Sequence, residues 1–567
     1  MPVALGAASA AASWQRWINP FLDSSREMNV PARLAAGERL YRDVAYHYGP
    51  VGPWLEASAI AVFGRRFAVL EVAGLLASIV LFASLWRLTA RAGSPLSACV
   101  AASWAAALCL GAPNGGSFLF PYSFDALFAL SAGFLCLSLA ADLRSRRAVV
   151  GSAFALCLAL ASKPEVGAAA AAVLLVGAAR SEDRGLARRI VRVAATGAGG
   201  ALALWAIAFS GVPSSDLSPE GPFALFSPPA EWRRVYRVIA GLADPRASLS
   251  AVATALFLSL LLLAAAWLVA KTAGRSHGFA EAAWILGALG AIGLLLSSGS
   301  GIDDRLPPLL SPMPIVAGIA ALWSLRIPLD SAWRARWLLF GFSAAFGSRV
   351  LLGLAYGART TPYSILAVPG LAASAAVLVL DLLPRRIQAP EAFRRLVAIA
   401  FLALALCAVF RWRRLQPADR SVPLRTAAGS LRLPQDRARV ASEVVAFLAD
   451  HARPGDTLSG APEAGFFNFV TGLESPLRQE QIFPGHLDAV REARVARRIE
   501  RAGPRYFLLV NEVPPAFGPA SFGRDYAAEV WSAVSRRYRL AASFGDAPAD
   551  APVGWPDFFV RVYERLP

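Results

Sequence analysis

The chain has 567 residues, of which 56% are hydrophobic, and it carries a formal net charge of +17. Apolar runs of about 20 residues recur, each long enough to cross a hydrocarbon core of roughly 30 Å as a helix. One water-soluble core could not bury so many runs, so the composition excludes an ordinary soluble globular protein. Arginines flank the apolar runs instead of forming a basic face with aromatic platforms, which argues against nucleic-acid binding.

Membrane spans are predicted from the apolar runs in chain order. The Ala-rich N-terminal stretch predicts a truncated or atypical first span, after which residues 23–53 form a polar loop. Further spans are predicted at 67–88, 98–112, 122–141, 148–161, 166–179, 190–212, 249–270, 280–297, 309–325, 337–356, 365–383 and 396–410. The expected fold is a mainly α, polytopic helical bundle of about 12–13 spans.

The basic loops predict the orientation of these spans. The stretch DLRSRR at 142–147, and the basic connections after Lys271, Arg326 and Arg385, are typical of cytoplasmic loops. The polar loops between them then fall on the outer face of the plasma (inner) membrane, at 23–53, 114–122, 163–165, 214–248, 298–308 and 359–363. Within 214–248, helical spacing of Trp232, Tyr236 and Ile239 predicts a helix lying in the membrane interface.

The tail after residue 412 has the composition of a soluble protein and is predicted to form an α/β domain on the outer, periplasmic face. Helices are expected at 437–451, 489–501 and 526–538, and strands at 506–510 and 558–563. The aromatic run from Phe466 to Phe469 is read as core. The predicted domains are therefore 1–54 (first outer loop), 55–412 (membrane domain) and 413–567 (outer domain).

Cysteine usage and loop composition give no sign of a cofactor. All five cysteines lie inside apolar runs and none forms a CxxC pair, so neither a disulfide nor a thiolate metal site is predicted. The tail has no Gly-rich phosphate loop, so no nucleotide is assigned to it. We predict no required cofactor and leave a divalent metal open.

The first outer loop carries a distinctive series of residues. In order, these are Asp23-x-x-x-Glu27, Pro31-Ala-Arg33-Leu, Gly37-Glu38-x-Leu-Tyr41-Arg42-Asp43 and Tyr48-Gly49-Pro50. The series resembles the first outer loop of bacterial glycosyltransferases of the C superfamily, the multispanning relatives of protein O-mannosyltransferases and of the aminoarabinose transferase that modifies lipid A. The resemblance implies an inverting sugar transfer from a polyprenyl-phosphate carrier. It also implies two short loop helices along the membrane and an early acidic residue of this loop as catalytic base.

Asp23 and Glu27 are the candidate catalytic residues. A carboxylate at the membrane surface could take a proton from an acceptor hydroxyl or amine. The two residues share one face of a helix, so Glu27 could assist Asp23. The alternative is that Asp23 caps the helix 24–34, while the negative charge of Glu27 interacts favourably with the dipole of that helix. The resemblance favours Asp23 as the base.

A departing carrier phosphate would need fixed cations. Lys163 is one of two lysines in the chain and lies near Glu165, with which a simple ion pair is the alternative. Arg349 lies deep in an apolar run, so it faces the protein interior or a cavity, or else binds a carboxylate for assembly. The outer-side candidates are Arg42, Lys163, Arg305, Arg349 and Arg359.

Other polar residues of the outer loops have competing interpretations. Asp43 and His47 lie four apart and could bind substrate or accept a proton, although such a pair more often fixes a loop. Tyr48 is a further substrate-binding candidate, and the Tyr48-Gly49-Pro50 sequence also turns the chain. Asp125 is most simply interpreted as a helix cap.

Three rival functions remain open from the sequence. A polytopic transporter or lipid-linked glycan flippase would make no bond, and such proteins commonly show paired repeats. A polysaccharide polymerase or ligase would carry its long loop later in the chain, and an inactive transferase fold could serve in assembly. The expected partners are a lipid-linked sugar donor and membrane lipids, with the sugar, the acceptor and the oligomeric state unspecified.

Overall fold

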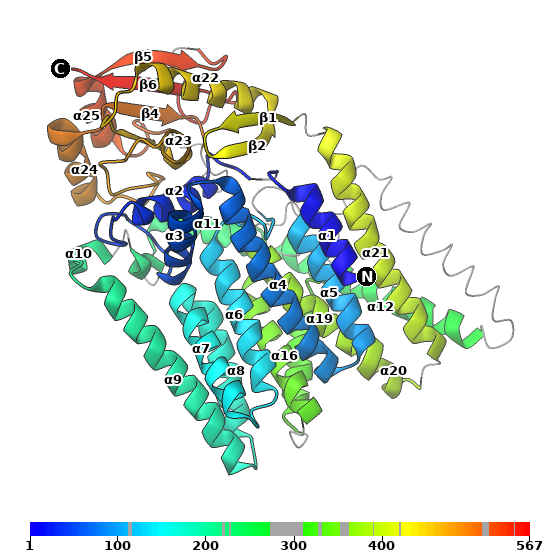
Figure 1. Cartoon of the computed structure of the whole chain (residues 1–567). Helices are drawn as coiled ribbons and strands as arrows, with labels where there is room; N and C mark the ends of the chain where they lie inside the picture. Colours follow the sequence, from blue (N-terminus) through cyan, green and yellow to red (C-terminus); the bar gives the residue numbers. More distant parts are fainter. Residues whose placement is uncertain are drawn as a thin grey trace.

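A bundle of long helices and a smaller α/β domain stacked on one end of it make up the molecule (Figure 1). The computed structural model describes residues 1–567 apart from 17, 112–115, 218–220, 226–227, 273–309, 327–330, 352–361, 389–390, 419–420, 513–516, 518–520 and 549. The predicted span 280–297 and the candidate residues Arg305 and Arg359 lie outside the described residues.

The helices of the bundle coincide with the apolar runs. They are α1 (Pro2–Ser13), α4 (Phe67–Ala92), α5 (Pro95–Gly111), α6 (Phe124–Ala140), α7 (Arg146–Ser162), α8 (Pro164–Ala179), α9 (Arg184–Phe209), α12 (Pro245–Thr272), α15 (Met313–Ser324), α16 (Ser331–Gly347), η3 (Ser348–Val350), α18 (Pro362–Ile365), α19 (Val368–Val377), the π-helical η4 (Leu378–Leu382), α20 (Leu383–Arg386) and α21 (Glu391–Ala418). The Ala-rich stretch forms α1, which packs against α5 and α21 and so belongs to the bundle.

Five helical segments in the described part of the chain are long and apolar enough to cross a membrane: Phe67–Ala92, Arg184–Phe209, Pro245–Lys271, Val368–Arg386 and Glu391–Phe410. Shorter apolar helices, among them α5, α6 and α8, pack beside them. The predicted mainly α, multi-pass membrane fold is confirmed. The total of twelve to thirteen spans stays a prediction.

Short helices lie at the end of the bundle that faces the C-terminal domain (Figure 1). They are α2 (Ser24–Ala35), α3 (Val51–Phe63), α10 (Ser214–Leu217), η1 (Pro222–Leu225) and α11 (Ala230–Ile239). The helix predicted around Trp232 is thus present as α11. Trp232 is buried, and its ring contacts the imidazoles of His47 and His486, so this side chain packs on protein.

In its described residues, the C-terminal domain combines a β-hairpin, a four-stranded sheet and four α-helices. The hairpin pairs β1 (Ser421–Thr426) with β2 (Gly429–Pro434), and the sheet has the order β3 (Leu458–Ala461), β4 (Tyr506–Val510), β6 (Val560–Arg565), β5 (Tyr538–Phe544). β3 and β4 run parallel, and the other pairs are antiparallel. The helices are α22 (Gln435–His451), α23 (Gly465–Thr471), α24 (Ala489–Ala502) and α25 (Ala528–Arg537).

Sequence reasoning found β4, β6, α22, α24 and α25 but missed β1, β2, β3, β5 and the short helix α23. β4 is buried at every position, which makes its apolar run conspicuous. β1 contains Pro423 and β3 has four residues, so neither shows a clear strand pattern. The helix expected at 526–538 ends at Arg537, because Tyr538 begins β5.

Aromatic packing joins the domain to the bundle. The Phe21 ring centroid lies 4.7 Å from that of Phe558 and 5.2 Å from that of Phe466. The Phe67 ring, at the start of α4, lies 5.5 Å from Phe469. The aromatic run of the tail is therefore core, as predicted, and it is shared with the membrane domain.

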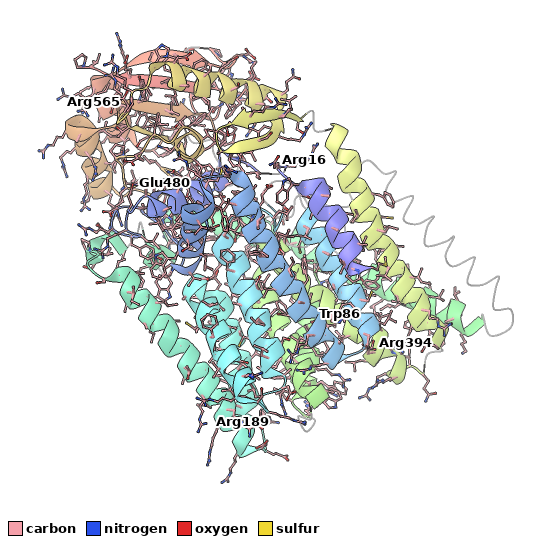
Figure 2. The ribbon with its side chains drawn as sticks, in the orientation of Figure 1. Arg16, Trp86, Arg189, Arg394, Glu480 and Arg565 are labelled. Carbon is pink, nitrogen blue, oxygen red and sulfur yellow. The ribbon has the colours of Figure 1, made fainter. Side chains whose placement is uncertain are left out.

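A polar contact between α2 and the C-terminal domain lies beside this aromatic core. A Cβ at Gly465 would come within 2.8 Å of Ser25 Oγ, so glycine permits the close approach of α23 to α2. Glu480 accepts hydrogen bonds from Asn29 Nδ2 at 2.8 Å and from Arg33 Nη1 at 2.5 Å. Figure 2 shows Glu480 at the junction of the two layers, with Arg189 at the far end of the bundle. The two layers are thus joined by both apolar and ionic contacts.

Candidate functional site

Asp23 lies immediately before α2, at the junction of the two layers. Its backbone has a φ of +49°, a conformation that is uncommon for residues other than glycine. Its side chain is 41% exposed and makes no cap hydrogen bond to α2. Oδ1 lies 3.5 Å from Arg26 Nη1 and 3.3 Å from Gln481 Nε2. The interpretation of Asp23 as a side-chain cap is therefore wrong, and its carboxylate is partly open to solvent.

Glu463, and not Asp23, accepts hydrogen bonds from backbone N–H groups at the N-terminus of α2. Its Oε2 accepts a hydrogen bond from the backbone N–H of Asp23 at 3.0 Å, and its Oε1 accepts one from that of Arg26 at 2.9 Å. The Gln481 amide also donates to Oε2 at 3.0 Å. Burial, followed by the charge of Asp23, raises the pKa of Glu463 to about 7. The C-terminal domain thus contributes directly to the site.

Arg26 and Glu27 form a buried ion pair under Asp23. Arg26 is 5% exposed, and its Nε and Nη2 donate to Glu27 Oε1 at 3.0 and 2.9 Å. Arg26 Nη1 donates to Gln481 Oε1 at 2.9 Å, and Glu27 Oε2 accepts from the Phe124 N–H at 2.8 Å. Burial raises the pKa of Glu27, and the Arg26 guanidinium opposes that rise. Arg26 therefore links Glu27 to Asp23, and the described contacts include no direct bond between the two carboxylates.

Asp125 is a buried carboxyl of the same region. Its Oδ2 accepts a hydrogen bond from Tyr46 Oη at 2.7 Å, and its Oδ1 accepts one from the Gly52 N–H at 2.9 Å. The cap of α6 is Ser123, whose side chain accepts from the Ala126 N–H. The interpretation of Asp125 as a helix cap is wrong, because this side chain fixes the first outer loop onto α6.

Lys163 occupies a break between two helices. Pro164 has no N–H to continue the ladder of α7 but suits the first turn of α8, so the chain is extended at Lys163. The buried ammonium lies 4.3 Å from the centroid of the Tyr48 ring and 3.3 Å from Tyr122 Oη. Burial lowers the pKa of Lys163 to about 8, so the side chain remains mostly charged at neutral pH.

Tyr48 connects the two cationic groups. The Arg26 guanidinium lies 5.1 Å from the Tyr48 ring centroid, while Lys163 approaches the same ring. Gly49 permits this placement, because a Cβ there would lie 1.8 Å from the carbonyl oxygen of Ala161. The Tyr48-Gly49-Pro50 sequence thus packs the loop against the end of α7, beyond turning the chain.

Arg349 reaches the same cluster through Glu165. Its Nη1 lies 3.1 Å from Glu165 Oε1, and Lys163 Nζ lies 3.8 Å from that oxygen. Two cations share one carboxylate here, which leaves one net positive charge. Lys163 is thus ion-paired, as the alternative interpretation held, and it also belongs to a larger cationic group with Arg349.

Arg42, Asp43 and His47 have other neighbours. Arg42 is largely exposed and lies 3.8 Å from Asp43 Oδ1, while Asp43 Oδ2 accepts a hydrogen bond from the Arg39 N–H at 2.9 Å. The His47 ring packs 5.0 Å from Trp232 and 5.3 Å from His486. The described contacts of Asp43 fix the loop. None of them is with His47, whose ring packs against Trp232 and His486 instead.

A small pocket opens between the first outer loop and the C-terminal domain. It is lined by Arg26, Ala45, His47, Gln479, Glu480, Gln481, His486 and Leu487. Burial lowers the pKa of His486 to about 3, so this imidazole is neutral. No group of three or more His, Cys, Asp or Glu side chains forms a metal site within the described residues.

Sequence reasoning missed Arg26, Glu463 and Gln481 as site residues. The signal for the last two was weak: Glu463 begins the segment EAGFFNFVTG, and Gln481 lies within the segment PLRQEQIFPG. Nothing local marks Arg26, which is one of many arginines in the chain.

Comparisons with known proteins identify the fold. No family model and no curated protein match the sequence. Among solved structures, the chain is similar to ArnT from Cupriavidus metallidurans bound to undecaprenyl phosphate, at 13% identity, 99% coverage of this chain, 97% coverage of that chain and a TM-score of 0.51. It is also similar to the Archaeoglobus fulgidus oligosaccharyltransferase complex with zinc and sulfate (13% identity, 97% and 72% coverage, TM-score 0.49). A further neighbour is the arabinofuranosyltransferase AftD from Mycobacteria (16% identity, 100% and 40% coverage, TM-score 0.38).

The ArnT comparison extends over nearly the whole of both chains, so this protein is a multi-pass membrane protein with the ArnT fold. The fold that the sequence resemblance implies is therefore confirmed by the ArnT comparison, while the superfamily itself stays a prediction.

Proposed function

We propose that this protein is a membrane glycosyltransferase that moves a sugar from a polyprenyl-phosphate carrier to a lipid, glycan or protein acceptor, with inversion at the anomeric carbon. The observation that carries the proposal is the exposure and position of the Asp23 carboxylate. It is partly exposed, and it does not cap α2 because Glu463 does so. It lies beside a buried set of cations and aromatic rings. The ArnT fold supports the same conclusion, and that neighbour holds undecaprenyl phosphate.

The chemistry follows from the charges of the site. Asp23 takes the proton from an acceptor hydroxyl or amine as that group attacks the anomeric carbon. The bond from this carbon to the carrier phosphate breaks, and its electron pair stays on the phosphate oxygen. Lys163, with Arg349 on the same carboxylate, supplies the positive charge that stabilises the departing phosphate. Arg26 pairs with both Asp23 and Glu27.

We assign the site to the outer face of the plasma membrane, with the C-terminal domain on the periplasmic side. The helix α2, which follows Asp23, and the C-terminal domain lie at one end of the bundle (Figure 1), while Arg189 marks the other end (Figure 2). Arginine-rich connections at that other end agree with the positive-inside rule.

The direct test is a transfer assay with the purified protein. The protein is incubated with a set of polyprenyl-phosphate sugars, each radiolabelled in the sugar, and with a membrane extract as acceptor source. Transfer of label from the carrier to an acceptor, or to water, supports the proposal. Label that crosses a vesicle membrane while still attached to the carrier would identify a flippase instead.

Substitution of Lys163 tests the binding of the carrier phosphate. Lys163→Gln is expected to lower kcat/KM for the donor by roughly 10- to 100-fold, because a hydrogen bond to a charged group contributes about 1.5–3 kcal/mol. Lys271→Gln is the matched control, since Lys271 lies at the end of α12 and contacts Trp267. Equal kcat/KM values for the two variants would contradict the assignment of Lys163.

A further inference from the structure

The carboxylate of Glu463 acts as the cap of a helix in the other layer of the molecule. The first N–H groups of a helix have no partner within it, and the cap residue usually supplies one from its own side chain. Here the acceptor comes from a residue 440 positions away, and Glu463 is 1% exposed. Capping of α2 therefore depends on docking of the C-terminal domain.

The same contacts determine the direction of the Asp23 side chain. A residue other than glycine stays at a φ near +49° when its surroundings hold it there. The Gln481 amide donates to both Glu463 Oε2 and Asp23 Oδ1, and its oxygen accepts from Arg26 Nη1. Glu463 thus fixes the backbone of Asp23. Gln481, which is hydrogen-bonded to Glu463, also orients the carboxylate of Asp23.

We infer that Glu463 is a positioning residue for the Asp23 carboxylate, so that docking of the C-terminal domain controls the rate of transfer at the membrane site. This inference rests on the proposed role of Asp23 as the base. A domain that undocks would leave the N–H groups of Asp23 and Arg26 without their Glu463 acceptors and release the strained backbone of Asp23. The base would then lose its fixed direction toward the acceptor.

The protonation of Glu463 makes this control dependent on pH. Among the described residues, the charged groups that face it are Asp23 and Arg26 from the start of α2, and its own domain adds the uncharged Gln481. The ionised carboxylate accepts hydrogen bonds on both oxygens. A proton turns one oxygen into a donor and removes one of these bonds. Because the pKa of Glu463 is raised to about 7, the fraction of docked molecules in which its carboxylate accepts both hydrogen bonds increases as pH rises through neutrality.

Stability should change in the opposite direction. The folded state holds the Glu463 proton more tightly than the unfolded chain does. This stabilising contribution is complete below the unfolded carboxyl pKa and is lost as pH rises through about 7. Transfer rate and thermal stability are therefore expected to move in opposite directions across the same pH window.

Glu463→Gln tests the inference in the full-length protein. Glutamine has one acceptor oxygen and resembles the protonated carboxyl at every pH. We expect kcat to fall roughly 2- to 30-fold at a pH well above 7, the range for loss of a cap, with an unchanged KM for the donor. The rise of the wild-type rate through neutrality, and the fall of its apparent Tm, should both flatten. Glu443→Gln, on the exposed side of α22, is the matched control.

Amide hydrogen exchange gives a readout that does not depend on activity. Exchange of the segment 20–27 should be faster in Glu463→Ala and Glu463→Gln than in the wild type or the Glu443→Gln control. Unchanged exchange and unchanged pH profiles in both Glu463 variants would overturn the inference, even if Asp23→Asn is inactive. Full activity of Asp23→Asn would instead overturn the proposed base, and the exchange data would still decide whether Glu463 caps α2.

Discussion

Replacement of Asp23 by asparagine is expected to lower the rate of sugar transfer by roughly 100- to 10,000-fold, the usual contribution of a general base. Asparagine keeps the shape of the side chain and can still accept a hydrogen bond from Gln481, but it cannot take a proton from the acceptor. The fold should persist, because the cap of α2 comes from Glu463 and the Asp23 side chain makes no cap bond. The measurement is the initial rate with a radiolabelled carrier-linked sugar.

The control for this prediction is Asp450→Asn, an equivalent change at an exposed position of α22. Both variants should insert, elute as the wild type does in gel filtration and show the same apparent Tm. The KM for the donor should also be similar in both, since the carrier phosphate is bound by other residues. An Asp23→Asn protein that retains the wild-type rate would remove the base from the proposed mechanism.

The membrane fold could be predicted because its signal is local. Each span is a continuous apolar run, and α4 and α9 appear where those runs lie. Three loop residues could also be selected as site candidates. Asp23 and Glu27 were selected by the family resemblance, and Lys163 because lysine is rare in this chain. In the structure, Asp23 contacts Arg26, and Arg26 and Lys163 both contact the Tyr48 ring. The spacing of these residues in the sequence does not predict these contacts.

The remaining parts of the site depend on contacts between distant segments. Glu463 lies 440 residues beyond Asp23, and Gln481 lies 455 residues beyond Arg26. No periodicity or local motif reports such a pair. Asp125 was misread for a different reason: Ser123 and Asp125 are both residues that cap helices, and sequence alone does not say which one does so. The hydrogen bonds in the structure show that Ser123 is the cap, because its side chain accepts from the Ala126 N–H while Asp125 is buried against Tyr46.

Removal of Arg26 is expected to be the most destabilising single change in the site. Arg26→Ala would leave Glu27 buried without its guanidinium partner, and breaking a buried pair in this way costs about 3–5 kcal/mol. It would also remove the hydrogen bonds to Gln481 and to the Tyr122 carbonyl oxygen. We expect a clearly lower apparent Tm, and faster proteolysis of the C-terminal domain because one of its contacts with α2 is lost.

A surface pair provides the contrast. Arg439 lies 2.7 Å from Asp546 and 3.5 Å from Glu443, but all three side chains are well exposed. Arg439→Ala should therefore change stability by about 0–1 kcal/mol. The double variant Arg26→Met, Glu27→Gln should recover much of the stability lost in Arg26→Ala, because it leaves no uncompensated buried charge. If Arg26→Ala melts as the wild type does, the contacts of Arg26 with Glu27 and Gln481 do not stabilise the site, and the aromatic core around Phe21 must do so.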